Sequence, residues 1–116
     1  MEVNGYKIEP GADLHQADLS GANLQGVDLS GANLFLAGFS GANLSGANLS
    51  NVTANSVFLV EANLSGANLT NATLFGAYLN FANLTGANLK GASLQGADLE
   101  GAVLTGATMP DGTIHD

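Results

Sequence analysis

An apolar residue recurs at every fifth position of this chain from Leu14 to Met109, without a single insertion. The residue is Leu except at Phe39, Ala54 and Met109, and the position two residues earlier always holds Ala or Val. A period of five does not suit an α-helix, because it would distribute the leucines around every face. It does not suit a flat strand either, because every second leucine would point to the opposite side. The chain must therefore bend once in each repeat.

The bend must fall outside the Ala and Leu positions. Residues two apart in extended backbone point to the same side, so Ala and Leu can both face an interior while the other residues turn the corner. Gly occupies the last position in twelve of the twenty repeats that fill residues 12–111. Because Gly tolerates the positive φ that many turns require, the sequence predicts a solenoid with an interior of Ala and Leu.

The number of repeats in one coil is indicated by the positions that share the same exceptions. At a lag of twenty residues, Gly forms an unbroken series from Gly26 to Gly106. The departures from Gly also align at this lag, as Gln16, Leu36 and Ser56, then Glu61 and Phe81, then Asn51 and Asn71. A lag of fifteen scatters them. We therefore expect four repeats per coil, a square cross-section and about five coils.

The run Gly21-Ala22-Asn23-Leu24 and its many copies resemble the pentapeptide-repeat proteins, in particular the loop-free type found in cyanobacteria. The resemblance covers nearly all of the repeat region. It implies an all-β fold, a right-handed quadrilateral β-helix with the Ala and Leu columns inside and the other three columns outside. It implies no particular function, since most of that family has none assigned.

Three segments are expected along the chain. Residues 1–11, which include Val3, Tyr6 and Ile8, are predicted to form an N-terminal cap, because open solenoid ends expose strand edges that need protection. Residues 12–111 form the solenoid, and residues 112–116 form a C-terminal closing tail that follows a turn after Met109.

Charge and composition exclude several classes of protein. Ten acidic residues against Lys7 and Lys90 give a net charge of −8, which argues against direct contact with nucleic acid. The N-terminus has no basic segment followed by an apolar stretch, so no secretory signal is predicted. Apolar runs are too short to span a bilayer. The default expectation is a cytoplasmic protein without membrane contact.

Catalysis and cofactor binding have no support in the sequence. There is no Cys, and His15 and His115 lie at opposite ends of the chain. Asp13 and Asp18 fall on different faces of the predicted prism, so they do not converge on a metal ion. A filled, narrow prism also offers no pocket for converging acid and base groups. We therefore expect no enzyme activity, no cofactor and no metal site.

Large apolar residues in the outward columns are the most informative departures from the repeat. Exposed apolar clusters mark partner surfaces, and aromatic side chains are favoured anchors there. We interpret this set as a patch that binds an unidentified protein or forms a homodimer, with Gly38 making room for the ring of Phe58. The alternative is that these side chains lie flat and only shield the backbone. The set comprises Phe35, Leu36, Phe58, Val60, Phe75, Tyr78 and Phe81.

A rigid interaction or scaffolding platform is therefore the predicted function. The family resemblance supplies a second hypothesis, because some acidic pentapeptide-repeat proteins mimic duplex DNA and occupy the DNA site of gyrase. The chain matches that group in shape and in the sign of its charge. It differs in having no inserted loops and only Glu61 as an acid in the middle three coils, whereas a DNA mimic needs negative charge along its length.

Overall fold

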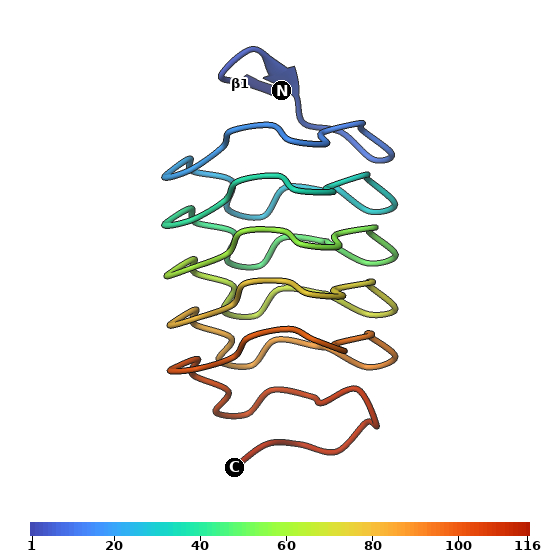
Figure 1. Cartoon of the computed structure of the whole chain (residues 1–116), viewed down its shortest axis with the longest axis vertical. Coiled ribbons are helices and arrows are strands. Elements are labelled where there is room, and N and C mark those ends of the chain that lie inside the picture. The colour runs from blue at the N-terminus through green and yellow to red at the C-terminus, as the bar shows by residue number, and fades with distance from the viewer.

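The computed structural model describes residues 1–116 as a stack of similar coils, with the N-terminus at one end and the C-terminus at the other (Figure 1). Parallel bridges join residues twenty apart throughout the repeats, from Asp13↔Asn33 to Asn88↔Thr108. One coil therefore contains four repeats, as the aligned exceptions predicted. The molecule measures 38 × 24 × 21 Å along its principal axes.

Each coil is hydrogen-bonded to the next through a recurring pair of backbone bonds. The Leu14 N–H donates to the Asn33 carbonyl of the next coil at 2.8 Å, and the Asn33 N–H donates back to the Ala12 carbonyl at 2.9 Å. Each bridge is only one residue long, because the chain turns after every repeat. The ladder of bridges thus holds the coils in a fixed register.

The interior is formed by the predicted columns. The leucines of the predicted interior column are buried from Leu14 to Leu89, and Phe39 is buried in the same column. In the third coil, Val52 and Val57 occupy positions that usually hold Ala, next to Ala54, which replaces a leucine. The two larger side chains offset the smaller one, and the cavity beside them has a volume of only about 10 Å³. A cavity of this size is at the lower limit for a water molecule.

The corners are tight turns of one common type. At the first corner the Ala17 N–H donates to the Leu14 carbonyl at 3.0 Å, and Gln16, the third residue of the turn, has a φ of 59°. A positive φ at the third position alone is typical of a type II turn, which favours Gly there. Gly21, the third residue of the next turn, has a φ of 71°, which confirms the predicted role of the glycines at the corners.

A β-hairpin covers the N-terminal end of the stack. Strand β1 (Glu2–Val3) pairs antiparallel with strand β2 (Tyr6–Lys7). Asn4 and Gly5 connect them with φ values of 52° and 82°, and two positive values are typical of a type I′ turn. Ile8 follows the hairpin and is buried against the first coil, with Val3 and Tyr6 packed beside it.

The C-terminal end is covered over only part of its area. The tail folds back so that Thr108 and Ile114 form an antiparallel bridge, and the Met109 N–H donates to the Thr113 carbonyl at 2.7 Å. The rest of the last coil has no further coil beneath it. Its interior leucines are consequently only half-buried and their N–H groups have no backbone acceptor, as at Leu94, Leu99 and Leu104.

No helix of membrane-spanning length and apolar character occurs in this structure.

Candidate functional site

The seven residues of the predicted patch come together on one side of the prism. We call residues 17–21 and the residues stacked on them in later coils the aromatic face. Phe58 and Tyr78 lie at its centre, and Val60 and Phe81 lie at the corner that ends it. Phe35, Leu36 and Phe75 lie at the corner that precedes it. The structure therefore assembles the whole predicted patch on this face and its two edges.

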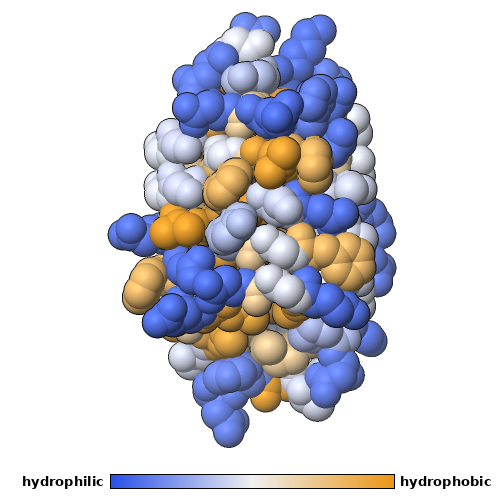
Figure 2. Space-filling model, viewed as in Figure 1, coloured by the Kyte–Doolittle hydropathy of each residue, from blue (hydrophilic) through white to orange (hydrophobic).

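The aromatic rings of the patch are open to solvent. Their exposed fractions range from 38% for Phe58 to 61% for Phe81, while Leu36 and Val60 are half-buried. Figure 2 shows one side of the molecule, on which much of the apolar surface lies between ends that are mainly hydrophilic. These side chains form an exposed apolar patch.

The centre of the face is a stacked aromatic pair. The rings of Phe58 and Tyr78 lie parallel, with an interplanar angle of 3° and centroids 5.0 Å apart. Their spacing follows the separation of neighbouring coils, because the two residues are bridge partners. The pair forms a continuous apolar surface over two coils.

This pair replaces the polar residue that most repeats carry at the same position. Elsewhere an Asn or Asp side chain accepts a hydrogen bond from the N–H two residues later, for example Asn63 from Ser65 at 3.0 Å. Phe58 and Tyr78 have no such acceptor, and the N–H groups of Val60 and Asn80 donate to no backbone carbonyl. The turns that follow Phe58 and Tyr78 therefore lack a side-chain-to-backbone hydrogen bond that many other repeats form.

The expectation for Gly38 is wrong. A Cβ at Gly38 would lie 3.3 Å from Ser20 Oγ and 3.7 Å from Asp18 Oδ1, and no atom of Phe58 is among its nearest contacts. The ring of Phe58 instead stacks on Tyr78 in the following coil. The space at Gly38 accommodates polar side chains of the preceding coil.

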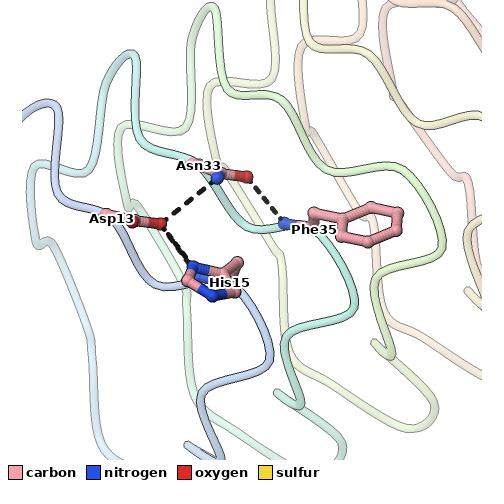
Figure 3. Close-up of polar contacts among 4 residues, drawn as sticks. All are labelled: Asp13, His15, Asn33 and Phe35. Atoms are coloured by element: carbon pink, nitrogen blue, oxygen red, sulfur yellow. Dashed lines mark hydrogen bonds and ion pairs between the residues drawn. The ribbon is translucent and has the colours of Figure 1, made fainter.

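Phe35 projects into solvent beside a small polar network (Figure 3). Asn33 Oδ1 accepts a hydrogen bond from the Phe35 N–H at 3.1 Å, and Asn33 Nδ2 donates to Asp13 Oδ1 at 3.2 Å. His15 Nδ1 lies 2.8 Å from the same Asp13 oxygen. These contacts with His15, followed in size by its backbone N–H, hold the pKa of Asp13 below its ordinary value. These hydrogen bonds fix the turn that begins at Asn33, while the ring of Phe35 remains exposed to solvent.

Asn55 lies between Phe35 and Phe75 in the same column, one coil from each. Its Oδ1 atom is buried and accepts no hydrogen bond. An unpaired buried acceptor costs about 1 to 3 kcal/mol. Sequence analysis did not identify Asn55, because the repeat pattern does not show which outward side chains are covered by their neighbours.

Unfavourable backbone conformations concentrate at the two corners that border the aromatic face. The corner residues from Gln16 to Gly106 all have a positive φ. One corner column is Gly in every coil, and in a second column the residues with a positive φ are Gly or Asn, which tolerates this conformation. The two corners beside the aromatic face carry larger residues, with φ values of 57° to 60°. These residues are Gln16, Leu36, Ser56, Glu61 and Phe81.

Phe81 lies across the corner of the next coil. A Cβ at Gly101 would collide with the ring of Phe81, so the ring occupies the space above the Gly101 backbone. The ring nevertheless remains the most exposed aromatic group of the patch. Phe81 thus shields some backbone, as the alternative interpretation expected, and still presents a large apolar surface to solvent.

Negative charge surrounds the end of the aromatic face that contains Tyr78 and Phe81. Glu61 precedes Phe81 in its column, and Glu100 adjoins Gly101 beneath the ring. Asp98 is the bridge partner of Tyr78. The side chain of Asn80 and the N–H of Glu100 donate to Asp98, which lowers the pKa of this carboxyl group.

Other surface features do not converge on a chemical site. No group of three or more His, Cys, Asp or Glu side chains lies close enough to hold a metal ion. A shallow polar depression of about 370 Å³ lies on the corner of the prism diagonally opposite Phe81. It is lined by Thr70, Asn71, Lys90, Gly91, Pro110 and Asp111. Val103 and Ile114 near the C-terminal end are also exposed, and they were not identified from the sequence.

Comparison with known proteins gives one family. A family model described as pentapeptide repeats matches in eight copies, over residues 12–51, 42–80, 59–91 and 82–111. Together these segments cover the entire repeat region. No curated protein shows significant sequence similarity to the chain.

Three solved structures illustrate the similarity. The pentapeptide-repeat protein Rfr23 from the cyanobacterium Cyanothece 51142 is 38% identical, with a TM-score of 0.64 over 86% of this chain and 65% of its own. HetL from Nostoc sp. strain PCC 7120, described as involved in the regulation of heterocyst differentiation, is 34% identical, with a TM-score of 0.45, and the match covers 90% of this chain and 62% of HetL. A pentapeptide-repeat protein of the Arabidopsis thaliana thylakoid lumen is 35% identical, with a TM-score of 0.48 and coverages of 90% and 69%.

The chain thus spans just under two thirds of the length of Rfr23 and of HetL. The family match and the likeness to Rfr23, together with the stacked coils, confirm the predicted right-handed quadrilateral β-helix.

Proposed function

The chain belongs to the pentapeptide-repeat family, and we propose that it acts as a rigid protein-interaction platform whose contact surface is the aromatic face. The backbone ladder holds this face in a fixed shape. A partner would therefore meet a preformed surface and would not need to order it, which lowers the cost of binding.

The observation that supports this proposal most strongly is the concentration of local costs around the aromatic face. A left-handed conformation costs a residue other than Gly roughly 1 to 2 kcal/mol, and the chain accepts it at Leu36 and Phe81. Unfavourable conformations that persist in a well-ordered structure cluster at functional sites. If these two corner positions served only the stability of the fold, Gly would be the favoured residue at both of them.

The acidic residues do not favour the DNA-mimic alternative. Four of the ten lie in or beyond the last coil and five lie in or before the first, so only Glu61 lies between them. Duplex DNA presents charge evenly along its axis. The aromatic face also interrupts the surface that such a mimic would present to a DNA-binding groove. If the mimic hypothesis were correct, excess protein would inhibit the supercoiling activity of gyrase.

A variant that restores the usual repeat residue tests the proposed surface. Phe58→Asn with Tyr78→Asn removes the aromatic pair and supplies the missing acceptors for the turn N–H groups. Val103→Ser is the matched control, because it removes an exposed apolar side chain from a different face. All three proteins would be immobilised and exposed to an extract of the source cells, and their solution masses would be measured by light scattering.

We expect the wild type and Val103→Ser to behave alike. Either both retain a protein that, once purified, binds them but not the double variant, or both are dimers while the double variant is a monomer. A partner that binds all three proteins equally, or a set of three identical monomers that bind nothing, would contradict the proposal.

A further inference from the structure

We infer that the aromatic face recognises a basic segment of a partner protein, in which Arg or Lys side chains accompany apolar anchors. This inference rests on the proposed function and adds the chemistry of the partner. It depends on the arrangement of charge around the aromatic rings.

The first observation is that carboxylates and rings share one end of the face. Phe81 lies between Glu61 of the preceding coil and Glu100 of the following coil, and the Phe81 N–H donates to the Glu100 carbonyl at 2.9 Å. Asp98 follows Tyr78 in the central column. Stacked coils are about 4.8 Å apart, so these carboxylates lie within the reach of one or two long basic side chains that also cover the rings.

The second observation is that no cation competes for these groups. Lys90 lies at the corner diagonally opposite the one that carries Phe81, and Lys7 lies in the N-terminal hairpin. The contact between His15 and Asp13 lies in the first coil, outside the acidic end of the face. No cation of the molecule therefore neutralises the carboxylates of Glu61, Asp98 and Glu100, which are exposed at the surface.

The chemistry of these groups selects the partner. A guanidinium or ammonium group is attracted to the face of an aromatic ring as well as to a carboxylate. The exposed rings of Tyr78 and Phe81 offer such faces next to the acids. A second copy of this chain fits less well, because its net charge of −8 would oppose contact between two acidic surfaces.

A peptide-display selection on the immobilised wild type, with a random twelve-residue library, tests the inference. Selected peptides would then be synthesised, and their affinities measured for three proteins. The first is the wild type, and the second carries Glu61→Gln, Asp98→Asn and Glu100→Gln. The third is a control that also loses three carboxylates, but away from the aromatic face, through Glu9→Gln, Asp28→Asn and Asp111→Asn. Asn preserves the turns, since Asn83 accepts the same bond from Thr85 at 3.0 Å.

We expect the selected peptides to be enriched in Arg or Lys beside aromatic or aliphatic residues. Each exposed ion pair contributes a fraction of a kcal/mol. A tenfold change in affinity corresponds to 1.4 kcal/mol, so the loss of three such pairs should weaken binding to the first triple variant on the order of tenfold at low salt. The difference should shrink as salt increases. The control variant should bind nearly as well as the wild type.

The remaining outcomes separate this inference from the proposed function. Peptides without basic residues that still require Phe58 and Tyr78 would overturn the inference and leave the proposed function intact, as would a homodimer formed through the aromatic face. Equal weakening in both triple variants would show a general effect of charge and would also overturn the inference. Failure to select any peptide that discriminates against Phe58→Asn with Tyr78→Asn would contradict both.

Discussion

Replacing Leu64 with Ala should destabilise the protein far more than the same change in the last coil. Leu64 lies in the central coil and has an exposed fraction of 0%, with Leu44 and Leu84 stacked on either side. Leu104 occupies the same column but is only half-buried, because no coil covers it. Both leucines lie between an Ala and a Gly at the same positions of the repeat, so the main difference between the two positions is their burial.

The expected magnitudes follow from burial. Leu-to-Ala changes in cores cost about 2 to 5 kcal/mol, and the cost is highest where the surroundings cannot collapse into the cavity. Hydrogen bonds to both neighbouring coils restrict such collapse at Leu64, so we expect about 3 to 5 kcal/mol there. At Leu104 less surface is buried and the last coil can open locally, so about 1 to 2 kcal/mol is expected.

Urea denaturation followed by circular dichroism measures both values, provided that the dependence of the unfolding free energy on urea concentration is the same for the two variants. Equal losses for Leu64→Ala and Leu104→Ala would refute the argument, because they would show that the coils below Leu64 do not bury it.

Three further results are expected. Gly46→Ala should cost about 1 to 2 kcal/mol of stability, because a Cβ at Gly46 meets no atom within 4 Å and only the φ of 66° opposes the change. Gly46→Asn should cost less, because Asn tolerates a positive φ. Equal unfolding midpoints for the two variants would contradict this. Gly101→Ala should cost more than Gly46→Ala because the added Cβ collides with Phe81, and a Phe81→Gly background should remove the excess; an excess that persists in the double variant would rule out the ring as its cause. Acidification should lower the free energy of unfolding, because hydrogen bonds depress the pKa of five carboxyl groups in the folded protein. Their contribution to stability is present above the ordinary pKa of 3.8 and is lost as the pH falls below it. A urea midpoint that rises between about pH 4 and pH 2 would contradict this. The five groups are Asp13, Asp18, Asp28, Asp98 and Asp111.

The interior and the coil size were predictable from the sequence because each depends on a strict period. The aligned exceptions at Leu36 and Ser56, for example, revealed that four repeats complete a coil, and the bridges at a spacing of twenty residues agree. The N-terminal hairpin was not predicted. Its signal was nevertheless present, since Asn4-Gly5 is the residue pair most strongly associated with a type I′ turn.

The details of the candidate surface depended on directions that a repeat pattern does not contain. The pattern places Phe58 and Tyr78 in one column, but it does not show that their rings stack in parallel or that Gly38 meets polar side chains of the preceding coil. It also does not show that the Oδ1 atom of Asn55, which lies between Phe35 and Phe75 in its column, is buried without a hydrogen-bond partner. Such features depend on side-chain orientations, which neighbouring coils determine together.

The central claim is that the aromatic face serves binding and is not needed for folding. The unfolding free energy of Phe58→Asn with Tyr78→Asn tests it most directly. The change removes a stacked pair worth about 0.5 to 1.5 kcal/mol beyond its buried area, and it restores two turn hydrogen bonds worth about 1 kcal/mol each. Because more than half of each residue is covered, the lost apolar contact adds about 1 to 2 kcal/mol in total. The account therefore predicts a net loss of no more than about 2 kcal/mol. A loss of about 3 kcal/mol or more, as expected when buried aromatic residues are removed, would contradict it and show that the rings are structural.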